Sequence, residues 1–191
     1  MAEMRPRIAE LFQYMDSTRA ALLDIARNMN PSLARIRPRS GAWSAAENLA
    51  HLALVERSAL RVMLKSIEQA RAAGIGPDDS DESFINSLDR FRVPESVTKL
   101  QAPERIVPDP STSVEESIAS LDASRAQLKQ IIIDNSDVGL SRIMFPHPVL
   151  KDLDMYQWAL FVAQHEERHR RQMERALDEV TERAAECAPI V

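Results

Sequence analysis

Cysteine, glycine and long apolar runs are scarce in this sequence, and each shortage excludes a class of protein. Among the 191 residues the only cysteine is Cys187, so no internal disulfide bond can form. No apolar run approaches the length of a membrane span, and the first residues lack the apolar stretch of a secretory signal. We therefore expect a cytoplasmic protein without a membrane partner.

The shortage of glycine and aromatic residues favours helices. Glycine occurs four times and aromatic residues make up 5% of the chain, whereas helix formers such as alanine, leucine and glutamate are abundant. The net charge of −5 leaves no basic excess to neutralise phosphates, so we expect no nucleic-acid partner. The apolar fraction of 45% is sufficient for a sizeable core, and the length predicts a single domain over residues 1–191.

Four long segments carry apolar residues at helical spacing. They cover residues 4–29, 44–73, 113–135 and 152–184. Ser44 with Glu47, and Ser113 with Glu116, form the capping-box pattern that starts a helix. Aspartates at the start of the last segment suit the positive end of a helix. Because no alternating pattern long enough for a strand is present, the sequence predicts an all-α four-helix bundle.

The connection between the second and third predicted helices is unusually long. Residues 74–111 contain an acidic stretch and five prolines, and a short helix is expected only at 82–91. A connection of this length is unusual inside a compact domain, and cover over a functional site is one common reason for it. At the other end of the chain, residues 185–191 are predicted to form a frayed tail.

Two of the four histidines lie one helical turn apart. His165 and His169 are spaced i, i+4 within the apolar stripe of the last predicted helix, so both point to the same side. Two neutral imidazoles in this arrangement can bind one divalent metal ion. A metal normally takes a third protein ligand, and His51 is the best candidate because it lies along the apolar stripe of the second helix.

Four further residues are candidates for supporting roles. Glu47 and Asn48 precede His51 by about one turn and could orient a ligand or a bound water. Gln172 continues the helix face that carries the histidine pair. His147, in a Pro-His-Pro loop, lies either at the mouth of a pocket or simply on the surface.

The stretch from His165 to His169 also matches the zinc-protease pattern His-Glu-x-x-His, with Glu166 as general base. The longer metalloprotease pattern needs a glycine and a third histidine further on, where this chain has Gln172 and Arg175. No strand is predicted that would align a peptide substrate. A zinc protease therefore remains a minor alternative.

Three short elements together resemble the DinB/YfiT-like family. They are Trp43-Ser44 to His51-Leu52, Phe145-Pro146-His147-Pro148, and His165-Glu166-Glu167-Arg168-His169 followed by Gln172-Met173. The resemblance extends over the whole chain and implies a four-helix bundle with up-down-down-up topology. It also implies a divalent metal, zinc or nickel, bound by His51, His165 and His169. Members of this family include thiol-dependent S-transferases and metal-dependent hydrolases.

Two kinds of function follow. The first is a metal-dependent thiol S-transferase or hydrolase that acts on a small molecule, with a metal-bound water or thiol as the nucleophile. Its partner would then be a small-molecule substrate, for example a low-molecular-weight thiol. The second is a non-catalytic binding or stress-response module whose histidines hold a structural metal or none. Apolar residues left over on the helix faces lead us to expect a homodimer.

Overall fold

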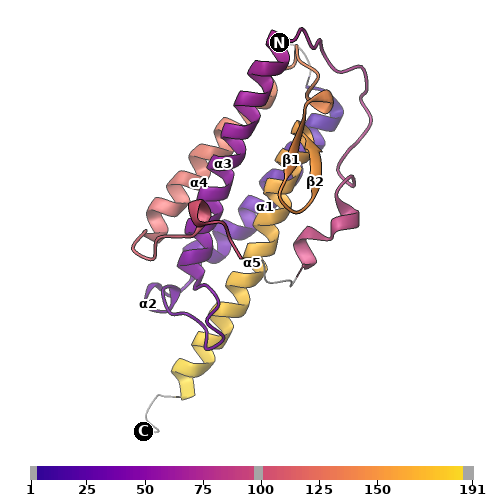
Figure 1. The fold of residues 1–191 in the computed structure, drawn as a ribbon. Helices are drawn as coiled ribbons and strands as arrows, with labels where there is room; N and C mark the ends of the chain where they lie inside the picture. Colours follow the sequence, from indigo (N-terminus) through magenta and orange to yellow (C-terminus); the bar gives the residue numbers. More distant parts are fainter. Residues whose placement is uncertain (1–3, 97–100, 187–191) are drawn as a thin grey trace.

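Four long helices dominate the computed structural model, which describes residues 4–96 and 101–186 (Figure 1). The long helices are α1 (Pro6–Asn28), α3 (Ala45–Ala72), α4 (Val114–Asp134) and α5 (Met155–Glu186). The short elements are α2 (Pro31–Ala34), the 3₁₀ turns η1 (Asp89–Phe91), η2 (Val93–Glu95), η3 (Glu104–Ile106) and η4 (Leu140–Arg142), and the strands β1 (Met144–His147) and β2 (Lys151–Asp154). The predicted all-α four-helix bundle is confirmed. None of the helices in the described ranges is long and apolar enough to span a membrane.

The helices have the up-down-down-up topology. In Figure 1, α1 and α5 run in one direction, and α3 and α4 run in the other. Arg71, at the end of α3, donates hydrogen bonds to Asn135 at 3.0 Å and Asp137 at 2.8 Å, just after the end of α4. Because α3 and α4 are parallel, the chain must return along the whole bundle between them, and residues 74–113 make that crossing.

Capping residues set where the helices begin. Both predicted capping boxes are present, with Ser44 paired to Glu47 and Ser113 paired to Glu116. The last helix begins at Met155, three residues later than expected, because Asp152 belongs to β2. Asp154 and Gln157 exchange side-chain to backbone hydrogen bonds at 2.8 and 3.1 Å, which caps this end of α5. At its other end α5 continues to Glu186, while Cys187 and the rest of the predicted tail lie outside the described residues.

A β-hairpin precedes α5, and the expectation that the chain has no strands was wrong. β1 and β2 pair antiparallel, with Phe145 opposite Leu153. Each strand is four residues long, too short to produce a recognisable alternating pattern. The indole Nε1 of Trp158 donates to the carbonyl oxygen of Phe145 at 3.2 Å, so α5 itself holds the hairpin in place.

The long connection packs against the bundle in turns, and the short helix predicted at 82–91 is wrong. This stretch contains turns and the single 3₁₀ turn η1. Leu88 is fully buried, and the ring of Phe84 stacks on Tyr156 with 4.9 Å between centroids. These tertiary contacts override the weak local preference for a helix. Arg92, in the left-handed region at φ 47°, and Pro94 then redirect the chain.

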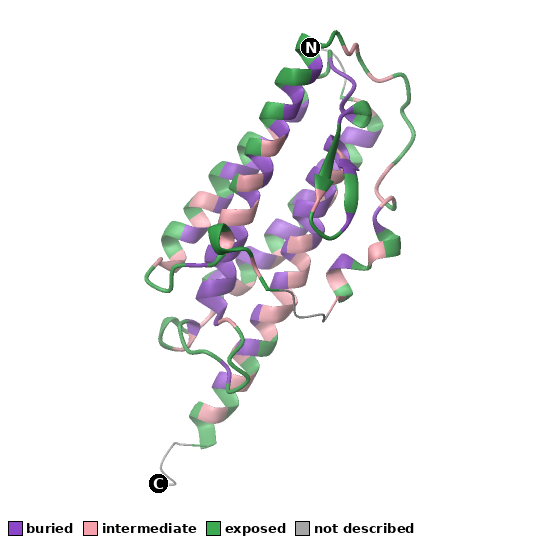
Figure 2. Cartoon of the chain, viewed as in Figure 1, coloured by how far each residue is buried: buried purple, intermediate pink, exposed green. Residues whose placement is uncertain are grey.

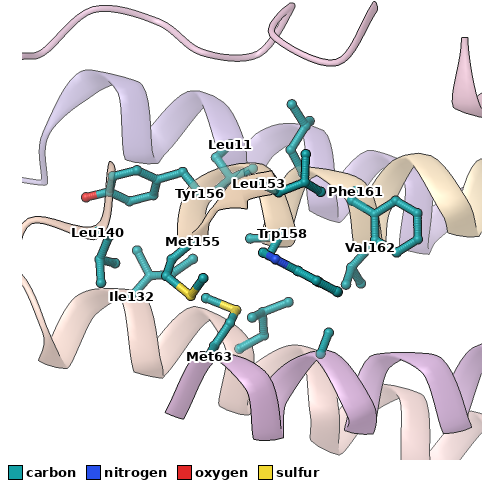
Figure 3. Close-up of a cluster of buried hydrophobic side chains, with 14 of the residues drawn as sticks. Leu11, Met63, Ile132, Leu140, Leu153, Met155, Tyr156, Trp158, Phe161 and Val162 are labelled. Carbon is teal, nitrogen blue, oxygen red and sulfur yellow. The ribbon is translucent and has the colours of Figure 1, made fainter. Parts of the chain in front are cut away.

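Buried residues lie on the inward faces of the helices (Figure 2), and their apolar side chains form two clusters. The larger cluster includes Met63, Met155 and Trp158, which Figure 3 shows in close-up. The smaller one surrounds Leu49 and Met173 nearer the other end of the bundle. Along each long helix, one buried charged residue separates the residues of the larger cluster from those of the smaller cluster. These residues are Arg19, Glu56, Arg125 and Glu166, and we call them the charged ring.

Candidate metal centre

Three histidines from two antiparallel helices meet in the bundle. His51 comes from α3, and His165 and His169 come from α5. Potential ligand nitrogens of the three rings all lie within 4.8 Å of one another, and the Nε2 atoms of His165 and His169 are 3.1 Å apart. Two nitrogens bound to the same zinc ion at about 2.0–2.1 Å in a tetrahedral site are ~3.3 Å apart. We call these three residues the histidine cluster, and its spacing is close to that of a metal site.

Hydrogen bonds to Nδ1 orient two of the three rings. Nδ1 of His51 lies 2.7 Å from the carbonyl oxygen of Ile106, which can only accept, so this nitrogen carries the proton. Nδ1 of His169 lies 2.8 Å from Oδ1 of Asn48. The amide nitrogen of Asn48 donates to the carbonyl oxygen of Ser44 at 2.9 Å, which fixes the direction of the amide. Both histidines therefore turn an unprotonated Nε2 towards the cluster.

Electrostatics keep the histidine cluster neutral. Burial lowers the pKa of His51, His165 and His169 below the usual value, and for His165 and His169 it does so strongly. The positive charge of Arg168 acts in the same direction on all three rings. Neutral imidazoles are the form that binds a metal ion. The residues thus fit a divalent ion of intermediate softness in both donor type and protonation state.

Aromatic rings and the long connection surround the cluster. The ring of Trp43 lies 4.6 Å from that of His51, and the ring of Phe161 lies 5.2 Å from that of His165. His51 and His169 are buried, whereas His165 is partly exposed. Ile106 belongs to η3, so a segment of the long connection touches the cluster directly. Cover over a functional site is one common reason for so long a connection, and here the connection contacts His51.

The carboxylate of Glu166 is bonded to arginines and not to the histidines of the described cluster. Its two carboxylate oxygens accept hydrogen bonds from Nε of Arg19, at 2.8 Å, and from Nη2 of Arg125. Glu56 completes the charged ring by accepting from the same two arginines, at 2.7 and 2.9 Å. A carboxylate held by two buried arginines is not available as a general base, so the zinc-protease interpretation of Glu166 was wrong.

Glu47 is likewise engaged elsewhere. Its carboxylate accepts from the guanidinium of Arg37 and from the backbone N–H of Ser44, at 2.8 and 3.0 Å respectively for Oε2. Burial alone would raise the pKa of Glu47, but these hydrogen bonds hold it below the ordinary value. Of the two residues expected to orient a ligand, Asn48 contacts His169 and Glu47 caps α3 instead.

The structure does not bring His147 or Gln172 into the cluster. His147 lies in β1, where its ring packs against Phe161 with 4.3 Å between centroids. Its Nδ1 accepts the backbone N–H groups of Val149 and Leu150, and burial lowers its pKa to about 4. Gln172 is partly exposed on α5, and within the described part of the chain no hydrogen bond joins it to the three histidines.

The charged ring was missed at the level of sequence, although a signal for it exists. Arg19 lies between the buried residues Met15 and Leu22, and Arg125 lies between Leu121 and Leu128. A charged residue inside an apolar stripe must find a buried partner of opposite charge. Such positions on several helices of one predicted bundle indicate that their side chains meet.

Comparison with known proteins gave a family, a relative and a solved structure. The DinB superfamily matches residues 14–173. The uncharacterised protein YuaE of Bacillus subtilis (strain 168) is 28% identical over 149 residues, which cover 78% of this chain and 85% of YuaE. The crystal structure of TT2238, described as a four-helix bundle protein, is similar with a TM-score of 0.56 and 24% identity. That similarity covers 88% of this chain and 98% of TT2238, and it concerns the fold alone.

Proposed function

Because this chain belongs to the DinB superfamily, we propose that its histidine cluster binds one divalent transition metal ion and that the loaded protein acts on a small molecule. The single observation that carries the proposal is the convergence of three potential ligand nitrogens within 4.8 Å. Zinc or nickel is the ion we expect, since both accept imidazole nitrogen readily.

The residues around the cluster prepare it for a cation. Ile106 and Asn48 hold the Nδ1 protons of His51 and His169, so that the Nε2 lone pairs of both rings face inward. The lowered pKa values of all three imidazoles favour their unprotonated form at neutral pH. Three protein ligands leave a coordination position open, as in catalytic rather than structural sites.

A bound divalent ion supplies Lewis acidity, which makes a nearby water or thiol a better nucleophile near neutral pH. Thiol transfer and hydrolysis both use such a nucleophile, and we propose them as the two reaction types. The chain's own contribution is to shape the approach. Phe161 and Trp43 restrict access with apolar rings, and the partly exposed side of His165 is where a small substrate would approach.

A second candidate is a non-catalytic module with a structural metal. The burial of His51 and His169 beneath aromatic rings and η3 favours it, because structural sites are closed to solvent. The two candidates differ in what chelation does. A structural metal raises thermal stability without any turnover of thiols or electrophiles, whereas a catalytic metal supports turnover that stops on chelation.

Metal analysis of protein purified without a histidine tag tests the proposal. We expect about one zinc or nickel ion per chain for the unaltered protein, and loss of that ion in His51→Ala and His169→Ala. His147→Ala is the matched control, because it removes a partly buried histidine outside the cluster. The proposal fails if the unaltered protein binds neither ion at micromolar concentration, or if the His147 variant loses the ion as readily as the other two.

A further inference from the structure

His165 differs from the other two histidines in one respect. Nδ1 of His51 and Nδ1 of His169 each have a hydrogen-bond partner. The Nδ1 atom of His165 is buried and, among the residues that the structure describes, has none. A buried ring nitrogen without a partner is costly, and metal-binding histidines almost always donate this N–H to a carboxylate, a carbonyl or a water.

A small cavity adjoins this ring. Its volume is about 10 Å³, the size of one water molecule, and its walls are mostly apolar side chains. The apolar walls are formed by Leu52, Val55, Leu121 and Val162. The other lining residues are His165 and the two acidic residues of the charged ring, Glu56 and Glu166. A site of this size, bordered by three residues that carry polar side chains, is suited to a single ordered water.

The carboxylates still have capacity to accept. Each oxygen of Glu56 and Glu166 accepts one hydrogen bond from an arginine, and a carboxylate oxygen has two lone pairs. A water that donates both its hydrogens to these carboxylates keeps its own lone pairs free. It is then an acceptor for the third polar neighbour, which is the Nδ1–H of His165.

We propose that one water in this cavity links His165 to the charged ring, so that Glu56 and Glu166 act as positioning residues of the metal site. The water accepts from Nδ1–H of His165 and donates to the two carboxylates. This fixes the His165 tautomer whose Nε2 is free to bind metal. The proposal rests on the proposed function for its purpose, but the link itself exists in the metal-free protein.

A competing arrangement makes the proposal testable. In the metal-free protein His165 could instead carry its proton on Nε2 and donate to Nε2 of His169, 3.1 Å away. The linked water favours Nδ1–H, and its removal favours Nε2–H. Long-range proton–nitrogen NMR on metal-free protein labelled with nitrogen-15 histidine distinguishes these two tautomers.

Val162→Ile fills the cavity and displaces the water without touching any charged residue. We expect the His165 tautomer to switch from Nδ1–H in the unaltered protein to Nε2–H in the variant, with His51 and His169 unchanged. We also expect zinc affinity, measured by competition with a chromophoric chelator, to fall by about 10–100-fold, as for the loss of other outer hydrogen-bond partners. Val180→Ile, a buried valine of the same helix away from the cavity, is the matched control and should change neither.

Val55→Ile fills the same cavity from α3 and gives a second test if the first variant does not fold. An Nε2–H tautomer of His165 in the unaltered metal-free protein would overturn the proposal, as would an unchanged tautomer in the cavity-filled variant. The tautomer is recorded without metal, so the two proposals are tested separately. A protein that binds no zinc would refute the proposed function, and the NMR spectra would still decide whether the water link exists.

Discussion

Two buried polar clusters lie next to each other in this bundle. They differ in how far their polar groups are paired with one another. The charged ring takes one residue from each long helix, and both carboxylates are bonded to both arginines. The histidine cluster takes residues from two helices and turns nitrogens with free lone pairs towards one another. Each carboxylate oxygen of the ring accepts a hydrogen bond from an arginine, whereas under the proposed function a cation completes the cluster.

The two clusters differ in a way that separates buried polar groups with a structural role from buried polar groups that bind a ligand. Buried polar groups in native proteins are almost always satisfied by protein or water. A neutral, closed set such as the ring fixes how the four helices align, since any shift of one helix would break its ion pairs. In the histidine cluster, by contrast, acceptor nitrogens converge without protein donors between them among the residues that the structure describes. Such an arrangement indicates a ligand.

The largest expected effect comes from opening the ring. Glu166→Ala leaves Arg19 and Arg125 with half of their buried countercharge, and we expect the free energy of unfolding to fall by about 3–5 kcal/mol. Urea denaturation monitored by circular dichroism measures it. Glu167→Ala, at the adjacent position on the partly exposed face, should cost under about 1 kcal/mol, because its pairs with Arg170 and Arg171 are near solvent. Equal losses in the two variants would contradict the assignment of the ring as a closed structural layer.

A smaller effect is expected on acidifying the metal-free protein, and it arises in the cluster. Histidines of the unfolded chain titrate near pH 6.5, whereas burial lowers the pKa of His51, His165 and His169 in the folded protein. Between these values the unfolded chain binds more protons, so the free energy of unfolding falls as the pH drops below about 6.5. Above about pH 8 all these rings are neutral in both states and contribute no slope.

Urea denaturation at pH 7.5 and pH 5.5 in the presence of a chelator measures this dependence. His147 titrates in the same direction because burial lowers its pKa to about 4, so the comparison is made in a His147→Gln background. In that background His169→Gln should reduce the loss of stability at the lower pH. If the loss stayed the same, the cluster would not be the source of the acid sensitivity.

The smallest effect concerns one outer contact of the cluster. Asn48→Ala removes the acceptor for Nδ1 of His169, and we expect zinc affinity to weaken by about tenfold, at the lower end for such partners. Competition with a chromophoric chelator measures the change. Gln172→Ala removes an amide from the same region of α5 that makes no hydrogen bond to the described histidines, and it should leave affinity unaltered. The opposite ranking of these two variants would mean that Asn48 does not orient His169.

Local signals in the sequence predicted most of the fold. Ser44 with Glu47 and Ser113 with Glu116 fixed two helix starts, because a capping box involves residues only three apart. The hairpin at 144–154 escaped prediction because four-residue strands are stabilised by contacts with α5, such as the hydrogen bond from Trp158. The turns at 82–91 escaped for the same reason, since Phe84 and Leu88 are held by distant side chains.

The candidate site was predictable where one helix carries it and less so where two helices meet. The spacing of His165 and His169 places both on one face without any knowledge of tertiary structure. Glu166 was open to misinterpretation, because its direction is decided by arginines more than 40 positions away in sequence. The partner of His51 could not be foreseen at all, since it is a main-chain carbonyl.

That carbonyl of Ile106 has a consequence for how this protein can change. Every amino acid supplies the same carbonyl oxygen, so the side chain at position 106 can be replaced without removing the acceptor of His51. The connection between α3 and α4 can therefore carry different side chains beside the histidines, and the hydrogen bond that orients His51 is kept. For protein engineering, η3 is a place where the surroundings of the histidine cluster can be altered while the three imidazoles are kept.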